Sequence, residues 1–192
     1  MRDVGAGLHA ALRLARGHAD GLALLTPAAD APPDSALATA SRSFWAAPLC
    51  LPAFLCLHLL DWAQQAAPLP PARSFALDLL GFGIGWVAFA LVSRELAARM
   101  GREALWPRFI AVWNWCNVVQ YLMLVLAALP VLLHLPDWVA QTVWLVAMGW
   151  ALWLEWFAAR LALDIAPLTA AGLVAIDVLI GLLLVVGMAM TG

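Results

Sequence analysis

The sequence predicts an all-α integral membrane protein, in which five transmembrane helices form one bundle with the N-terminus in the cytoplasm and the C-terminus in the periplasm. Of its 192 residues, 65% are hydrophobic and only 11% are charged, whereas about 25% of residues are charged in a soluble domain. Five apolar stretches approach or exceed the roughly 20 residues that a helix needs to cross the hydrocarbon core. The bilayer is therefore the expected solvent of this chain.

The distribution of positive charge predicts the orientation. All ten positively charged residues are Arg. Four precede the first apolar stretch, four lie between the second and the third, and one lies between the fourth and the fifth, which leaves only Arg73 on the opposite side. Because cytoplasmic loops of membrane proteins carry the excess of Arg and Lys, the Arg-rich side is the predicted cytoplasmic side.

The chain divides into two predicted regions. Residues 1–42 form a cytoplasmic extension, and residues 43–192 form the five-helix membrane domain. The predicted spans cover approximately residues 43–60, 74–93, 108–133, 138–156 and 165–190. These spans and their short connections leave no room for a second folded domain in water.

The extension contains a short amphipathic pattern. Within residues 4–16, Leu8, Leu12 and Ala15 share one helical stripe. This pattern suits a helix that lies on the inner leaflet. A weakly ordered tail is an equally open interpretation, because many short amphipathic patterns bind nothing.

The first two spans carry helix-breaking and small residues. Pro48 and Pro52 lie inside the first span, and each removes a backbone donor, which predicts a kink. In the second span, Gly81 and Gly85 are four residues apart, a spacing that allows a neighbouring helix to approach closely. We expect this glycine face to be a helix-packing surface.

The third and fifth spans carry polar residues in an apolar setting. Asn114, Asn117 and Gln120 recur every three residues and form one stripe, and Asp177 interrupts the fifth span. At 1.5 Å per residue, Asn117 and Asp177 both lie about 14 to 15 Å from the cytoplasmic face. We therefore expect the two to meet near the midplane, either to hold two helices together or to relay protons or ions.

The fourth span ends with an acidic residue. Glu155 lies at the predicted inner end of this span, five residues before Arg160. We expect its carboxylate to extend to water or to pair with Arg160, because long charged side chains near helix ends reach toward the interface.

A local sequence echo marks two span ends at the outer face. His58 and Asp61 precede Trp62 at the end of the first span, and His134 and Asp137 precede Trp138 after the third. Imidazole and carboxylate groups are suitable zinc ligands, so these four His and Asp residues are a candidate metal site. The alternative is polar residues at helix ends beside interfacial Trp.

Sequence motifs for catalysis and nucleic-acid binding are absent. The chain has no HExxH zinc-protease motif and no GxSxG nucleophile motif, which argues against an enzyme. Its formal net charge is -2, and no basic tract indicates nucleic acid. We expect no cofactor.

The overall arrangement resembles the Yip1-type membrane protein superfamily. The resemblance covers residues 43–190 and rests on five helices, a cytoplasmic N-terminal extension, short loops, the glycine-rich GFGIG at residues 81–85, and a third span marked by Pro and Arg. It implies a non-enzymatic integral membrane protein that acts through partners.

Two functional hypotheses follow from the sequence. The first is a scaffold or accessory subunit of a membrane complex, which contacts the lipid bilayer and another membrane protein or a second copy of itself. The alternative is a small transporter or channel with a polar midplane site around Asp177 and Asn117. The absence of Lys and the abundance of Ala, Arg, Gly and Pro indicate a GC-rich bacterial genome and thus a multi-pass protein of the bacterial cytoplasmic membrane.

Overall fold

The regular structure is entirely helical in the part of the chain that the computed structural model describes, residues 2–26, 32, 34–65 and 70–191. Its elements are α1 (Arg2–Leu14), η1 (Ala19–Leu24), α2 (Ser35–Ser43), α3 (Ala46–Gln65), α4 (Pro71–Arg99), η2 (Glu103–Leu105), α5 (Trp106–Ala127), α6 (Leu129–Leu132), α7 (Asp137–Leu163) and α8 (Pro167–Thr191). Five helical runs are long and apolar enough to cross a membrane: Ser35–Gln64, Pro71–Arg99, Glu103–Leu132, Asp137–Leu163 and Pro167–Met188. The predicted all-α architecture with five membrane-crossing helices is confirmed at this level.

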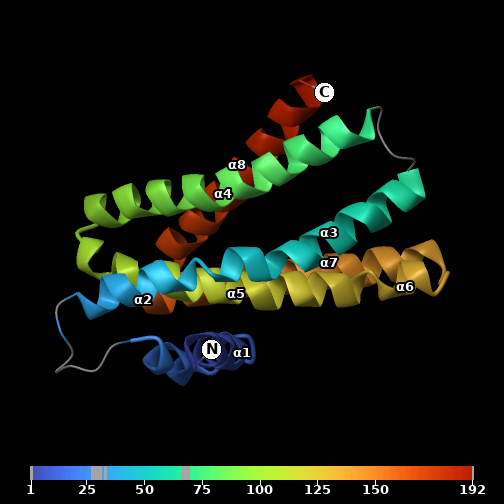
Figure 1. Ribbon diagram of the computed structural model, residues 1–192. Helices are drawn as coiled ribbons and strands as arrows, with labels where there is room; N and C mark the ends of the chain where they lie inside the picture. The colour runs from blue at the N-terminus through green and yellow to red at the C-terminus, as the bar shows by residue number, and fades with distance from the viewer. Residues whose placement is uncertain (1, 27–31, 33, 66–69, 192) are drawn as a thin grey trace.

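The long helices form two groups (Figure 1): α4 and α8 pack together, and α1, α2, α3 and α7 pack around α5. α8 also contacts α7 and so joins the two groups. The first span is interrupted at Phe44 and Trp45, between α2 and α3. Pro48 consequently lies in the first turn of α3, where its missing N–H breaks no helical hydrogen bond, and Pro52 lies inside the same helix.

The half of α5 nearer the Arg-rich end of the bundle is the core of the protein; we call this end inner and the opposite end outer, after the predicted orientation. The residues of α5 from Phe109 to Cys116 are all buried, whereas Leu122 and Leu126 in its outer half are exposed. A helix that is apolar all round is buried either in protein or in lipid, and in this half α1, α2, α3 and α7 enclose it. The outer half, in contrast, presents apolar side chains to lipid.

An arginine joins the inner ends of α5 and α7. Arg108 Nε donates to the carbonyl oxygen of Ala162 at 3.0 Å, and its Nη2 donates to the same oxygen at 2.6 Å. The last carbonyl groups of a helix lack partners within the helix, and a cation there also interacts favourably with the helix dipole. Arg108 therefore satisfies the C-terminus of α7 from the neighbouring span.

The surface of α4 indicates where the inner membrane boundary lies. Exposed apolar side chains line the helix from Leu79 to Val92. The next exposed residues are charged, namely Arg94, which pairs with Glu103, and Glu95, which pairs with Arg99. The 29 residues of α4 measure about 43 Å at 1.5 Å per residue, longer than the roughly 30 Å hydrocarbon core. We place the boundary near Ser93, beyond which α4 extends into water.

The N-terminal helix docks on the bundle. Figure 1 shows α1 nearly end on, whereas α2 to α7 run across the view, so α1 lies across the spans. Gly7 sits directly over the indole ring of Trp115, leaving no space for a side chain, and Ala10, Ala11 and Leu14 are fully buried. This arrangement gives α1 a protein-facing side as well as a solvent-facing side.

The stripe of Leu8, Leu12 and Ala15 meets the rest of the protein at two of its three residues, and its placement on the inner leaflet stays a prediction. Leu8 and Ala15 pack against the core, but Leu12 is 37% exposed. The closely packed face consists instead of small residues around Gly7 and Ala10, because only small side chains allow α1 to approach α5 so closely.

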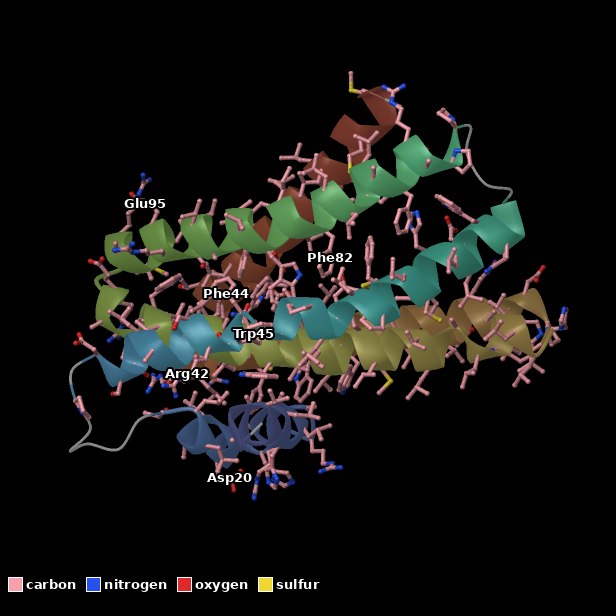
Figure 2. The ribbon with its side chains drawn as sticks, in the orientation of Figure 1. Asp20, Arg42, Phe44, Trp45, Phe82 and Glu95 are labelled. Atoms are coloured by element: carbon pink, nitrogen blue, oxygen red, sulfur yellow. The ribbon has the colours of Figure 1, made fainter. Side chains whose placement is uncertain are left out.

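A short return segment packs beside α1. η1 contacts both α1 and α7, Gly21 lies against the Ala10 carbonyl, and Leu25 is buried. Arg13 Nε donates to Asp20 Oδ1 at 3.0 Å, and Figure 2 shows Asp20 on the side facing away from the bundle. The charged groups of the N-terminal segment thus stay at the surface while its apolar groups pack inward.

Replacing Gly7 with Leu tests this docking. We expect Gly7→Leu to collide with Trp115 and to lower the free energy of unfolding by about 1–3 kcal/mol, the usual cost of overpacking. The control is Gly5→Leu, because a Cβ at Gly5 meets nothing within 4 Å. Thermal unfolding in mild detergent, with trypsin cleavage at Arg13 as a second readout, should rank Gly7→Leu below the control; equal behaviour of the two variants would contradict the docking.

Candidate functional site

The polar stripe of α5 forms hydrogen bonds to two neighbouring helices and within α5 itself. The fully buried Asn114 donates from Nδ2 to Ser43 Oγ of α2 at 2.7 Å, and Gln120 donates from Nε2 to the Ala151 carbonyl of α7 at 2.7 Å. Asn117 donates to the Trp113 carbonyl of its own helix at 3.0 Å. Two of the three amides therefore tie α5 to other helices, while Asn117 bonds locally.

Asp177 faces a second carboxyl group. Its side chain on α8 lies near that of Glu155 on α7, and both lie near the indole of Trp113 on α5. The neighbour of Asp177 on α7 is thus a carboxyl group that the sequence did not predict at this position. We refer to Glu155 and Asp177 as the inner carboxyl pair.

The expectation that Glu155 extends to water or to Arg160 was wrong. Glu155 is only 7% exposed, and the guanidinium of Arg160 lies over the ring of Trp156, 5.7 Å from its centroid. The reason is helical geometry: at 100° per residue, five residues rotate the side chain by about 140°, so the two residues occupy different faces. Glu155 points into the bundle and Arg160 points outward.

Glu155 also lacks a hydrogen-bond donor on one oxygen. Within the described ranges, no donor reaches the buried Oε1 of Glu155, nor the buried Oδ1 of Asn114. Buried polar atoms in proteins nearly always have a partner, so each exception needs an explanation. The inner carboxyl pair is therefore not fully satisfied by the protein around it.

The position of the inner carboxyl pair follows from helix levels. Trp113 contacts Trp86 and Phe89 of α4, with ring centroids 5.3 Å and 4.6 Å away. These two residues precede the boundary at Ser93 by seven and four positions, or about 6 to 11 Å along the helix axis. The pair thus lies inside the hydrocarbon layer but closer to its inner side than the predicted midplane.

The register of one helical hairpin could have revealed this pair. Glu155 lies eight residues before the end of α7, and Asp177 lies ten residues after the start of α8. Because α7 and α8 are antiparallel and joined by a short connection, residues at similar distances from it lie at similar depth. The predicted fourth span ends at residue 156, seven residues before the end of α7. The similar depth of Glu155 and Asp177 was therefore not evident from the predicted spans.

A second titratable pair lies toward the outer side. His58 Nε2 of α3 is 2.8 Å from Asp78 Oδ2 of α4. The imidazole is surrounded by aromatic rings of both helices, including Phe54 at 5.8 Å and Trp62 at 4.9 Å between centroids. We refer to His58 and Asp78 as the outer pair.

The four residues proposed as a metal site are separated. Asp61, His134 and Asp137 line one cavity at the outer end of the bundle, but His58 instead contacts Asp78. Within the described ranges, no group of three or more His, Cys, Asp or Glu side chains is placed to hold a metal ion. Three of the four residues in the two similar segments therefore line a cavity, and the four do not form a metal coordination sphere.

The glycine face of α4 is covered by α8. A Cβ at Gly81 would lie 2.6 Å from Met188 Sδ, and one at Gly85 would lie 3.5 Å from Leu184 Cδ1. The absence of a side chain at Gly81 allows α4 and α8 to approach closely there. This face is occupied by the chain itself.

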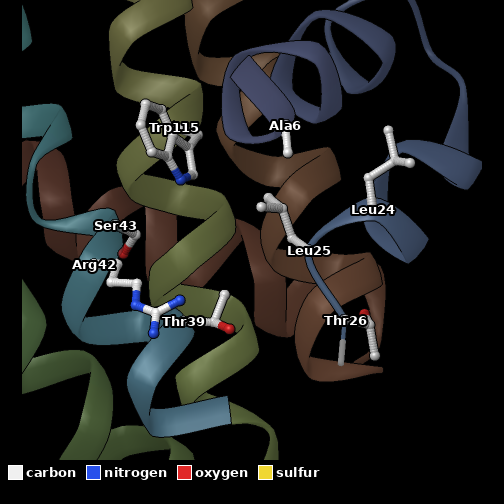
Figure 3. Close-up of a pocket in the computed structure, with 8 residues that line it drawn as sticks. All are labelled: Ala6, Leu24, Leu25, Thr26, Thr39, Arg42, Ser43 and Trp115. Atoms are coloured by element: carbon white, nitrogen blue, oxygen red, sulfur yellow. The ribbon is translucent and has the colours of Figure 1, made fainter. Parts of the chain in front are cut away.

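A small cavity of about 180 Å³ lies beside α1 on the inner side. Figure 3 shows Thr39, Arg42, Ser43 and Trp115 on one side of it and Ala6, Leu24, Leu25 and Thr26 on the other. Ser43 both lines this cavity and accepts the hydrogen bond from Asn114. The side chain of Ser43 therefore lies between this cavity and the buried Asn114 of α5.

Comparisons with known proteins add no relative: no family model, curated protein or solved structure matches the chain. The resemblance to the Yip1-type superfamily stays a prediction from the sequence.

The Asn114 contact can be tested with two serines of the same helix. Ser43 and Ser41 each donate to the carbonyl three residues earlier, but only Ser43 accepts from a buried amide. We expect Ser43→Ala to lower the free energy of unfolding by about 1–3 kcal/mol, because it leaves Asn114 Nδ2 buried without its acceptor. Ser41→Ala should change it little; chemical denaturation in detergent measures both, and a Ser43→Ala variant as stable as wild type would refute the contact.

Proposed function

We propose that this protein is a small proton carrier of the bacterial cytoplasmic membrane and that the inner carboxyl pair is its proton-binding site. The observation that carries the proposal is the incomplete satisfaction of a buried carboxyl group in a membrane-spanning helix. Ionisable residues inside membrane segments are costly and typically mark substrate or proton pathways. The proposal develops the transporter alternative drawn from the sequence.

The chemistry of the pair supports proton binding. Glu155 and Asp177 are neighbouring carboxyl groups in a setting where a charged group is costly to bury. Two adjacent carboxylates repel each other, so one proton shared by the pair relieves both the repulsion and the cost of burial. Loss of that proton creates charge that the surrounding helices must accommodate, which is how proton release can be linked to helix movement.

The surroundings of the pair favour a carrier over an open channel. A column of aromatic rings leads from the inner to the outer pair, through Trp113, Trp86, Phe82, Phe54 and His58. Successive ring centroids in this column are 4.9 to 6.0 Å apart, as in close aromatic packing. Phe82 also contacts Tyr121 of α5. Because the column is packed, a proton can pass between the two pairs only when helices move.

A scaffold would have to bind its partner through surfaces other than the glycine face and the polar helix faces that the sequence predicts. The glycine face of α4 packs on α8, and Asn114 and Gln120 bond to neighbouring helices. A partner would have to bind the exposed apolar faces, which lipid also covers. The accessory-subunit role remains a prediction, and purification in gentle detergent separates it from the carrier, because a scaffold would co-purify with a stoichiometric partner.

The orientation proposed here places nine of the ten Arg residues in the cytoplasm. We expect alkaline phosphatase, which is active only outside the cytoplasm, to be active when fused after Gly192 and inactive when fused after Arg102. Fusions to green fluorescent protein at the same positions should give the opposite pattern. An active enzyme after Arg102 would reverse the topology.

Proton uptake tests the proposed function directly. In liposomes containing a trapped pH indicator, we expect the wild type to carry protons down an imposed pH gradient. Glu155→Gln and Asp177→Asn should each reduce the rate at least about tenfold, in the range of a lost general acid or base group. Glu95→Gln is the matched control, because its carboxylate is exposed at the inner end of α4 and pairs with Arg99.

The same variants identify the outcome that would reject the carrier. Each must elute from size exclusion as wild type does, so that a lost rate reports on the carboxyl group rather than on folding. Wild-type rates in both Glu155→Gln and Asp177→Asn would remove the inner carboxyl pair from any proton pathway and leave it a structural contact.

A further inference from the structure

The outer pair lies at one depth on two neighbouring helices. α3 and α4 run in opposite directions (Figure 1), with His58 seven residues before the end of α3 and Asp78 seven residues after the start of α4. Seven residues span about 10 Å along a helix axis, so both side chains lie well inward from the outer helix ends. Their Nε2 and Oδ2 atoms are 2.8 Å apart. An imidazole and a carboxyl group therefore meet inside the hydrocarbon layer.

One layer of aromatic rings lies on each side of the outer pair. Toward the outer end, Trp62 of α3 and Phe75 of α4 meet edge to face, with ring centroids 6.3 Å apart. Toward the inner end, the ring centroids of Phe54 of α3 and Phe82 of α4 are 4.9 Å apart. We refer to Trp62 and Phe75 as the outer ring layer and to Phe54 and Phe82 as the inner ring layer. Each layer thus takes one ring from each helix.

Helical spacing explains how the two ring layers enclose the outer pair. The rings of α3 lie four residues to either side of His58, and those of α4 lie three residues before and four residues after Asp78. Residues three or four apart share one face of a helix, so the pair and both ring layers line the same gap between α3 and α4. The imidazole of His58 lies 4.9 Å from the ring of Trp62 and 5.8 Å from that of Phe54, between centroids.

The contact within the outer pair is not a directed hydrogen bond. Asp78 Oδ2 is close to His58 Nε2, yet this nitrogen is buried and no hydrogen-bonding partner of suitable geometry reaches it among the residues that the structure describes. The oxygen therefore lies away from the direction in which an N–H group would point. Such a contact is a poor means of joining α3 to α4, since an apolar pair of similar volume often joins helices at lower cost.

The net charge of the outer pair depends on whether it holds a proton. With a neutral imidazole and an ionised carboxylate the pair is negatively charged, whereas with a protonated imidazole it has no net charge. A pair without net charge is less costly to enclose between apolar rings than a charged one. Proton uptake therefore favours the enclosed arrangement, and proton release requires that one ring layer separates and admits water.

The other ionisable groups of the surrounding helices lie outside the two ring layers or already take part in interactions. Asp61 follows His58 by one turn of α3, Arg73 precedes Asp78 by five residues on α4, and each takes part in an interaction of its own. On α5, the phenol of Tyr121 belongs to a ring that contacts the inner ring layer. On α8, which packs on α4, the inner carboxyl pair supplies the only titratable group. The outer pair is thus the titratable centre between the ring layers.

We propose that the outer pair is a second proton-binding site, which exchanges protons with water on the outer side when the outer ring layer opens. This proposal rests on the proposed carrier function, because it names the point at which the same proton path reaches the outer side. The inner ring layer separates the pair from the rings of Trp86 and Trp113, which lead to the inner carboxyl pair. Opening of one layer at a time lets a proton pass without a continuous path of water.

Proton flux in two single variants tests the site. In the liposome assay used for Glu155→Gln, we expect His58→Gln and Asp78→Asn each to lower the rate at least about tenfold, in the range of a lost general acid or base group. His58→Gln keeps a side chain that can hydrogen-bond to the carboxylate, so its unfolding temperature should stay close to that of wild type. His18→Gln is the matched control, because His18 is exposed in the N-terminal segment and should leave the rate unchanged.

Chemical modification of His58 tests the outer ring layer without a proton gradient. Diethyl pyrocarbonate modifies the unprotonated imidazole, and mass spectrometry locates the product among the four His of the chain. We expect Trp62→Ala to raise the modification of His58 about 2- to 10-fold, the change in open population that loss of one aromatic contact allows. The exposed His134 is the internal reference. Trp45→Ala, which removes an exposed ring at the α2–α3 junction, should leave the modification of His58 unchanged.

The outcomes separate this proposal from the carrier proposal. A low rate in Glu155→Gln with wild-type rates in both His58→Gln and Asp78→Asn would remove the outer site and leave the carrier standing. A wild-type protein that carries no protons would overturn both proposals. Rates that fall in the two outer-pair variants only together with a lowered unfolding temperature would show a structural contact and reject the site. Equal modification of His58 in the wild type and in Trp62→Ala would reject the role of the outer ring layer.

Discussion

The enclosure of the inner half of α5 is the constraint on which the rest of this structure depends. A helix that is apolar on every side cannot remain at a surface facing water, and in this chain α1, α2, α3 and α7 all pack against it. Each contact is then adapted to that helix: Gly7 allows α1 to lie on Trp115, Ser43 accepts from Asn114, and Arg108 reaches the carbonyl of Ala162. The positions of both titratable pairs follow from this packing.

The sequence predicts the helices well because the information for them is local. Apolar length and Arg placement are read along the chain without knowing which helices are neighbours. The docking of α1 was harder to predict, because the decisive residues Gly7, Ala10 and Ala11 are small and contribute little to a hydrophobic stripe. Their value arises only from the ring of Trp115, more than 100 residues away in the chain. Tertiary packing, rather than local hydropathy, selected the buried face.

Asp177 and the polar residues of α5 were predicted as members of the candidate site, but Glu155 and its pairing with Asp177 were not. Asp177 and the polar residues of α5 stand out because charged and amide groups are rare in an apolar span. Their partners depend on helix rotation and register, which a span boundary misplaced by a few residues obscures. Glu155 illustrates the effect: the predicted span ended at residue 156, whereas α7 continues to Leu163. A residue assigned to the interface therefore lies inside the bundle.

Gln120 and Glu155 illustrate two kinds of buried polar side chain, one bonded to a neighbouring helix and one with an oxygen that no donor among the described residues reaches. A residue retained only to hold helices together should find its partner, as Gln120 does with the Ala151 carbonyl, because an unmade hydrogen bond in an apolar interior costs free energy. Glu155 has no donor at Oε1 within the described ranges and faces another carboxyl group. Such an arrangement is a poor means of joining α7 to α8, since an apolar pair of similar volume would join them at lower cost. We therefore propose that the inner carboxyl pair is retained for a proton that it takes up and releases.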